Sequence, residues 1–125
     1  MDKPPATTEV MKDETAPLLS KDRLLLDVAE VYGLETTAGK EFLRIALENC
    51  VLMDRKQRDY GSSNISRHGV HGIVIRMWDK MERLSNLFTN KRRKATNESI
   101  RDSFRDISNY AIIAIMVDSG KWPDK

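Results

Sequence analysis

The sequence predicts an all-α fold, a helical bundle of three to four main helices with a flexible N-terminal tail. The 105 residues from Leu18 to Trp122 contain no proline, which favours helices joined by loops that contain glycine. Apolar residues recur along this span at intervals of three and four, and no alternating strand pattern lies between them. Because each apolar stripe must be covered by another element, such helices are expected to pack as a bundle.

The length of 125 residues fits one domain. We expect a flexible tail over residues 1–17, which hold three of the four prolines, a single helical domain over residues 18–122, and a short tail over residues 123–125. The 21 basic and 19 acidic residues give a net charge of only +2, which argues against a strongly basic protein that wraps nucleic acid. No nucleic-acid partner is therefore expected.

Cysteine content and hydropathy predict a cytoplasmic protein, in the host cytoplasm if it is encoded by a phage. Cys50 has no second cysteine with which to form a disulfide, and the N-terminus does not resemble a secretion signal. The longest apolar run, Tyr110–Val117, is far shorter than the roughly 20 residues that span a bilayer. We expect no membrane partner, and Cys50 is expected to be a core residue.

The first two helices are expected over residues 20–32 and 37–60. A Ser20 N-cap would begin the first, and Gly33 follows its end. The second would stop at Gly61, and its apolar side carries Phe42, Ile45, Ala46, Cys50 and Met53.

A third and a fourth helix follow. The third has the most regular apolar stripe, made of Val70, Ile73, Val74, Met77, Met81, Leu84 and Phe88. The fourth would run over residues 98–119 from a cap at Thr96 or Asn97, with Gly120 as the C′ residue. Its segment 111–117 is apolar all round and is expected to be buried on every side. A small bundle would not cover it fully, which predicts a homo-oligomer, most simply a dimer.

An acidic stripe is predicted on the fourth helix. At 100° per residue, Glu98, Asp102 and Asp106 share a sector of about 80° with Asn109. Carboxylates one turn apart repel each other, so the stripe is expected to need a compensating cation, either arginine side chains or bound Mg²⁺. The alternative is a solvated acidic face that pairs with Arg101 and Arg105.

Two more acids, Asp79 and Glu82, stand three residues apart on the third helix. Two facing helices that each supply two carboxylates can hold Mg²⁺ against substrate phosphates. The alternative is that both acids only form surface pairs with Arg76, Lys80 and Arg83. The candidate metal ligands are Asp79, Glu82, Glu98, Asp102 and Asp106.

The segment from Lys56 to Asn64 combines groups that suit a phosphorylated ligand with a ring. Lys56 and Arg58 would bind phosphate, and Tyr60 would stack on the ring. Gly61 with Ser62 would allow a close backbone approach. Asn109 joins them as a candidate ligand-binding residue. The alternative is an ordinary helix end and loop.

Other chemistry-bearing residues have weaker patterns. His68 and His71 lack a spaced cysteine or aspartate partner and are expected to be structural or surface residues rather than a zinc site. The basic run Lys91–Lys94 would bind phosphate if it folded over a cleft, and is otherwise a solvated loop.

Three blocks of sequence resemble the phage and bacterial nucleotide modification associated domain family over about Val51 to Val117. They are Lys56–Ser62, Arg76–Leu84 and Asn97–Ala111, in that order. This family is distantly similar to the all-α nucleoside triphosphate pyrophosphatases, the MazG-like and dimeric dUTPase group. Those proteins are Mg²⁺-dependent helical bundles that dimerise or tetramerise and cut a nucleoside triphosphate to monophosphate and pyrophosphate.

The hallmark of the pyrophosphatases is ExxE on one helix and ExxD on the next. The first pair falls on Asp79 and Glu82, and the final aspartate falls on Asp106, whereas the preceding glutamate would be Ser103. The resemblance implies that the catalytic residues Glu82, Asp102 and Asp106 hold Mg²⁺, with Glu98 or Asp79 assisting.

The leading prediction is Mg²⁺-dependent binding of a (deoxy)nucleoside triphosphate, with or without hydrolysis to the monophosphate, in phage or bacterial nucleotide metabolism. One alternative is a non-catalytic protein that binds a nucleotide or sequesters a signalling nucleotide. Another is a structural helical adaptor.

Overall fold

The structure, a computed structural model, describes residues 20–89 and 97–123 and confirms the all-α fold, since these residues form helices and contain no strand. The tail predicted at residues 1–17 and the basic run Lys91–Lys94 lie outside the described residues. No helix in the described part of the chain is long and apolar enough to cross a membrane. The chain divides into two compact units, Met1–Glu48 and Asn49–Lys125, which are described in turn.

The first unit contains a helix at residues 20–31 and the beginning of α2 (Thr37–Tyr60). The first helix ends where Gly33 adopts a φ of 70°, and the N–H of Leu34 then donates to the carbonyl of Ala29 at 2.8 Å. This closure satisfies a carbonyl that the helix end leaves without a partner. Thr36 caps α2, because its Oγ1 accepts a hydrogen bond from the N–H of Gly39 at 2.9 Å.

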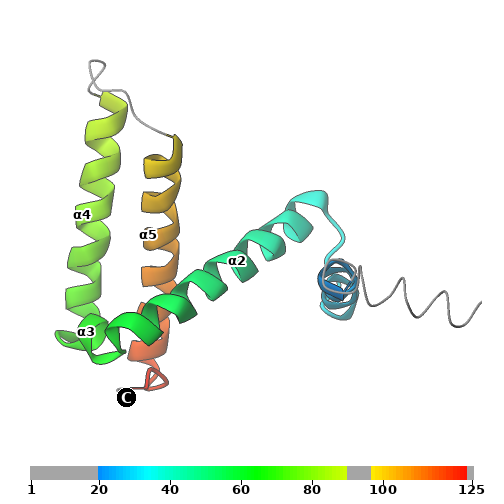
Figure 1. Ribbon diagram of the computed structural model, residues 1–125, viewed down its shortest axis with the longest axis horizontal. Coiled ribbons are helices and arrows are strands. Elements are labelled where there is room, and N and C mark those ends of the chain that lie inside the picture. The colour runs from blue at the N-terminus through cyan, green and yellow to red at the C-terminus, as the bar shows by residue number, and fades with distance from the viewer. Residues whose placement is uncertain (1–19, 90–96, 124–125) are drawn as a thin grey trace, which may run out of the picture. The chain divides into compact units, whose positions relative to one another are not determined.

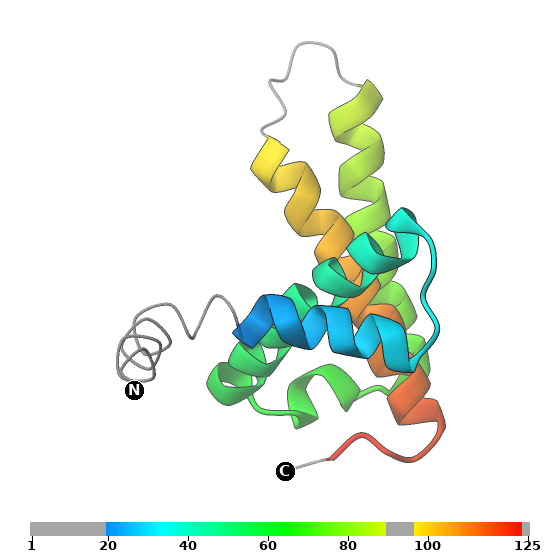
Figure 2. The same ribbon diagram turned by 90° about the vertical axis from the view of Figure 1, so that its right-hand side faces the viewer.

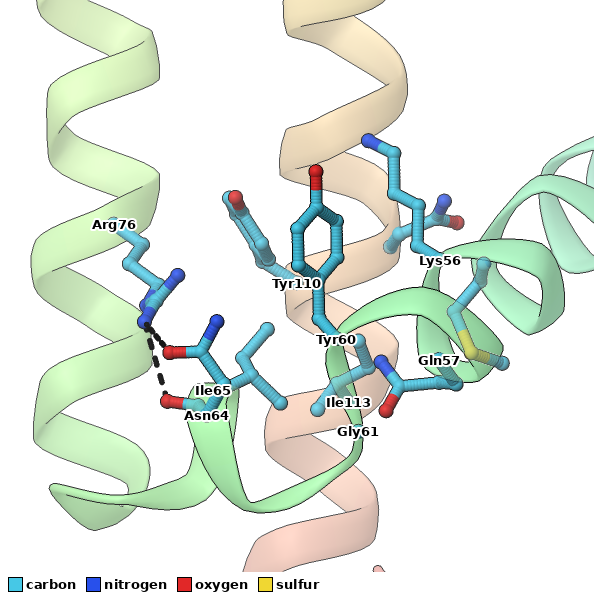
Figure 3. Close-up of a pocket in the computed structure, with 11 residues that line it drawn as sticks. Lys56, Gln57, Tyr60, Gly61, Asn64, Ile65, Arg76, Tyr110 and Ile113 are labelled. Carbon is cyan, nitrogen blue, oxygen red and sulfur yellow. Dashed lines mark hydrogen bonds between the residues drawn. The ribbon is translucent and has the colours of Figure 1, made fainter.

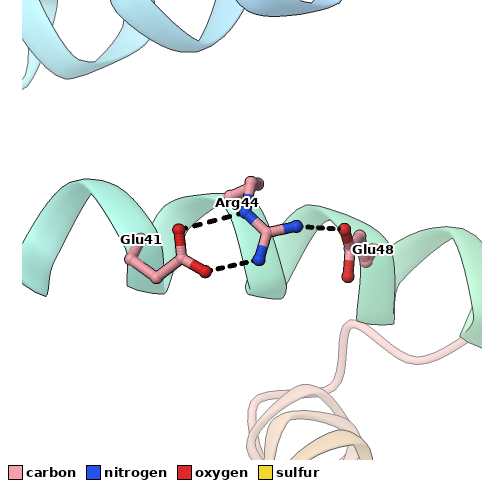
Figure 4. Close-up of polar contacts among 3 residues, drawn as sticks. All are labelled: Glu41, Arg44 and Glu48. Carbon is pink, nitrogen blue, oxygen red and sulfur yellow. Dashed lines mark hydrogen bonds and ion pairs between the residues drawn. The ribbon is translucent and has the colours of Figure 1, made fainter.

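A charged network lies along the exposed side of α2 in the first unit (Figure 4). The guanidinium of Arg44 donates from Nε and Nη2 to the carboxylate of Glu41, and from Nη1 to Glu48 at 2.5 Å. The hydrogen bond from Arg44, with its positive charge, lowers the pKa of Glu41, and the two carboxylates raise the pKa of Arg44.

Substituting Arg44→Gln is expected to return the pKa of Glu41 to that of an ordinary glutamate, because it removes both the charge and the paired donors. A lowered folded-state pKa adds stability above the unfolded-state value, and this contribution is lost as the pH falls through the lowered pKa. Carboxyl-carbon chemical shifts across a pH titration measure the effect. An unchanged pKa in the variant would show that another group perturbs Glu41. Arg23→Gln, the same change at an exposed arginine of the helix at residues 20–31, is the control.

The second unit joins the last turns of α2 to α3 (Ser63–Ser66), α4 (Gly69–Thr89) and α5 (Asn97–Asp118). α4 and α5 lie side by side and run in opposite directions in both views (Figures 1 and 2). α5 ends as its sequence predicts. Gly120 adopts a φ of 72° just beyond it, and the N–H of Lys121 donates to the carbonyl of Met116 at 2.8 Å.

The core of the second unit is built on Ile65, Ile73 and Ile113, from α3, α4 and α5. Ile73 is completely buried, and half-buried apolar side chains surround the three isoleucines. Trp122, beyond the end of α5, also packs here, and its Nε1 donates to the carbonyl of Ser62 at 2.9 Å. This hydrogen bond fastens the segment after α5 to the turn before α3.

Two predictions about burial are wrong. The segment 111–117 is not buried on every side, because Ile112 is 52% exposed and Ile115 is 67% exposed. These two side chains point away from the face that α5 turns toward α4 and α3. Cys50 is exposed rather than in the core, whereas its neighbour Asn49 is buried. Consecutive residues point about 100° apart on a helix, so the burial of Asn49 turns Cys50 outward.

The buried face of α4 is rotated from the predicted apolar stripe. Ile73 and Leu84 are buried as expected, but Val74, Met81 and Phe88 of the stripe are exposed. Lys80 is half-buried instead. At 100° per residue Lys80 lies within about 40° of both Ile73 and Leu84, so a lysine occupies the middle of the buried face. Such a residue needs a partner of opposite charge on a neighbouring helix.

Candidate functional site

A cavity of about 280 Å³ lies in the second unit, where the end of α2, α3, α4 and α5 meet (Figure 3). Its shape depends on the turn that ends α2. Gly61 adopts a φ of 76°, which a residue with a Cβ rarely adopts, and its N–H donates to the carbonyl of Gln57 at 2.8 Å. The chain then enters α3, which places Asn64 and Ile65 in the cavity wall.

The charged side chains that line this cavity are both cations, Lys56 of α2 and Arg76 of α4. Nη2 of Arg76 donates to the backbone carbonyl of Asn64 at 3.2 Å and to its Oδ1 at 3.3 Å, as Figure 3 shows. These contacts hold the guanidinium in place through one nitrogen. They leave Nε and Nη1 to donate elsewhere.

Two tyrosines from different helices give the cavity its aromatic character. Tyr60, the last residue of α2, is largely exposed, whereas Tyr110 of α5 is half-buried against the isoleucine core. Both rings stand in the cavity region of Figure 3. The apolar part of the wall is formed by Met53, Ile65 and Ile113. The site therefore offers ring faces and an apolar wall beside two cations.

Two amide side chains complete the polar lining. Oε1 of Gln57 is buried and has no hydrogen-bond partner within the described ranges. Asn109 is buried, and its Nδ2 donates to the backbone carbonyl of Asn49 at 3.3 Å. Asn109 thus ties α5 to α2 at the cavity.

Asp106 lies between two lysines. Its Oδ1 is 3.1 Å from Nζ of Lys56, and its Oδ2 is 3.1 Å from Nζ of Lys80. The carboxylate is 15% exposed, so these ion pairs are shielded from water more than surface pairs are. Lysines of α2 and α4 therefore compensate this part of the acidic stripe, where the sequence predicts arginines or Mg²⁺.

Among the described side chains, Asp79, Glu82 and Asp102 form no metal-binding group with Asp106. Asp102 is 59% exposed and 4.0 Å from Nη1 of Arg105, and Asp79 and Glu82 are exposed on α4. The side chain of Glu98 lies outside the described part. No three histidine, cysteine, aspartate or glutamate side chains in the described ranges could hold a metal ion together. The Mg²⁺ cofactor stays a prediction.

The structure brings together four of the six residues predicted to bind the ligand. Lys56, Tyr60, Gly61 and Asn109 line the cavity. Arg58 and Ser62 do not. Arg58 is exposed and lies 3.5 Å from Asp54 one turn earlier in α2, while the carbonyl of buried Ser62 accepts the hydrogen bond from Trp122.

Sequence reasoning missed Arg76 and Tyr110 as cavity residues. A signal for Arg76 was present, because it stands three residues after Ile73 and therefore flanks the buried stripe of α4. A cation at the edge of an apolar stripe is positioned to border a site between helices. Likewise, Tyr110 lies three residues before the buried Ile113 on α5 and therefore also flanks a buried stripe.

The second unit is therefore an all-α module with a cavity that combines cations, tyrosines and amides. Residues 56–117, just under half of the chain, match the family described as nucleotide modification associated domain 1. This match confirms the first part of the resemblance, and the matched segment includes Lys56, Tyr60, Arg76 and Tyr110. No curated protein and no solved structure is significantly similar to the chain.

Proposed function

We propose that this protein binds a nucleotide in the cavity between α2, α3, α4 and α5. The observation that supports the proposal is the lining itself, which combines two tyrosines with two cations and, among the residues that the structure describes, includes no carboxylate. The base would lie against Tyr60 and Tyr110, and phosphate would lie toward Lys56 and Arg76. The matched family description, which refers to nucleotide modification, is consistent with such a ligand.

The chemistry of each group suits a part of a nucleotide. Stacking of a base on an aromatic side chain contributes about 1–3 kcal/mol and tolerates any base. A guanidinium donates two parallel hydrogen bonds to phosphate, and an ammonium adds charge.

The geometry favours binding without turnover over Mg²⁺-dependent hydrolysis. The predicted catalytic residues Glu82 and Asp102 are exposed, and both oxygens of Asp106 contact lysines. Ser103, where the pyrophosphatase motif would place glutamate, is buried and supplies no carboxylate. Hydrolysis by Glu82, Asp102 and Asp106 stays a prediction. The sequestering alternative is the proposal that the described residues support better.

Isothermal titration calorimetry with purine and pyrimidine nucleotides, with and without Mg²⁺, tests the proposal. Tyr60→Ala is expected to weaken binding about tenfold or more, since it removes one stacking surface, while Tyr60→Phe keeps it. Tyr32→Ala is the matched control, because Tyr32 is an exposed tyrosine of the first unit. Chromatography of the incubated nucleotides reports turnover.

Three results would count against parts of this proposal. If no nucleotide binds to the wild-type protein, the function is wrong. If binding is unaffected by Tyr60→Ala, the ligand lies elsewhere. Release of pyrophosphate that requires Mg²⁺ would establish the hydrolase in place of the sequestering protein.

A further inference from the structure

A second cavity, of about 440 Å³, adjoins the first in the same unit. It is lined by Arg76, Asp79, Lys80, Arg83 and Tyr110. Arg76 and Tyr110 also line the first cavity, so the two spaces meet at this arginine and this ring. A ligand that fills the first cavity therefore has a second space next to it.

The lining of the second cavity is cationic. Arg76, Lys80 and Arg83 follow one another at spacings of four and three residues, which places them on one face of α4 within about 60°. Asp79 is the one carboxylate among the described residues of this lining. Although Asp106 pairs with Lys80, the described residues of the two cavities together with Asp106 include four cationic side chains and two carboxylates. The local field attracts an anion.

The cations are also held in position. Arg76 is anchored to Asn64 through Nη2, and Lys80 is anchored to Oδ2 of Asp106. Anchored cations lose less side-chain entropy when they bind an anion than extended surface lysines do. Arg76 has donors left for both spaces, so it can bridge groups bound on its two sides.

We propose that the second cavity is a subsite for a second phosphoryl group of the same ligand. The inference rests on the proposed function, since the first cavity must hold the base and the first phosphate. Nucleotides with two or more phosphoryl groups then bind more tightly than the corresponding monophosphate. The preference for the diphosphate over the monophosphate depends on Arg83, which lines the second cavity and does not line the first.

The test compares a nucleoside monophosphate, its diphosphate and inorganic tripolyphosphate by calorimetry on the full chain. Arg83→Gln is expected to weaken diphosphate binding about tenfold and to leave monophosphate binding unchanged. Asp79→Asn removes the carboxylate of the subsite and is expected to strengthen diphosphate binding severalfold. Arg58→Gln, the same change on an exposed arginine that lines neither cavity, is the matched control.

The outcomes separate this inference from the proposed function. Equal affinity for the monophosphate and the diphosphate, with Tyr60→Ala still weakening both, overturns the subsite and leaves nucleotide binding standing. Equal losses for both ligands in Arg83→Gln also overturn the subsite. If tripolyphosphate binds as tightly as the diphosphate and depends on Arg83, while Tyr60→Ala leaves binding of the diphosphate nucleotide unchanged, the phosphoryl subsite stands and the base-binding proposal falls. Binding of none of the three ligands overturns both.

Discussion

Asp106→Asn is expected to lower the free energy of unfolding by about 1–3 kcal/mol and to leave nucleotide binding in place. The substitution removes the charge that pairs with Lys56 and Lys80 at a position that is mostly shielded from water. It also leaves both lysines available to phosphate, so the affinity for a nucleotide is expected to stay the same or to rise. Urea denaturation with and without nucleotide and Mg²⁺ measures both effects.

The sequence-based prediction for the same variant is the opposite. If Asp106 is a Mg²⁺ ligand in a set of repelling carboxylates, its replacement by asparagine would leave the unliganded protein as stable or more stable. It would also abolish the stabilisation by Mg²⁺ and nucleotide. Asp102→Asn is the matched control, because that exposed carboxylate is expected to change stability by less than about 0.5 kcal/mol.

Ile73→Ala is expected to destabilise the protein most, by about 3–5 kcal/mol. Ile73 is fully buried at the centre of the second unit, so truncation removes buried methyl groups and leaves a space that the three surrounding helices cannot close completely. Since Ile113 and Tyr110 pack in the same cluster, the cavity proposed to bind the nucleotide should loosen too. Thermal or urea denaturation gives the value.

Ile112→Ala is the matched control for Ile73→Ala, because the same atoms are removed from a side chain that is half exposed on α5. Its effect is expected to be below about 1 kcal/mol in a monomer. A larger loss that depends on protein concentration would show that Ile112 is buried between copies, as the predicted homo-oligomer requires. Light scattering over the same concentrations checks this.

For Ile73→Ala, a loss of less than about 1 kcal/mol in the free energy of unfolding would contradict the described core.

Local signals in the sequence were sufficient for the helices. The predicted limits of α2, residues 37–60, are those of the structure, and glycines with positive φ follow α2 and α5 where the sequence places their ends. These limits depend on backbone preferences within one turn, which neighbouring residues largely determine. The short α3 was missed, because four residues contain too little periodicity to indicate a helix.

The candidate site could be predicted only in part. The segment from Lys56 to Asn64 supplies Lys56, Gln57, Tyr60, Gly61 and Asn64 to the cavity, and its mixture of residue types indicated a phosphorylated ligand. Arg76 and Tyr110 come from α4 and α5, far along the chain. Whether three distant helices face one space depends on how they pack, which spacing within each helix does not reveal.

The sequence by itself determined the helical class and the limits of α2. The tertiary structure decided which face of α4 and α5 is buried. Apolar periodicity includes Val74, Met81 and Phe88 in the buried face of α4, yet all three are exposed, while Lys80 and Asp106 lie on the inner side. A charged side chain can lie there only when a partner on another helix offsets its desolvation, and Lys80 and Asp106 are each other's partners across α4 and α5.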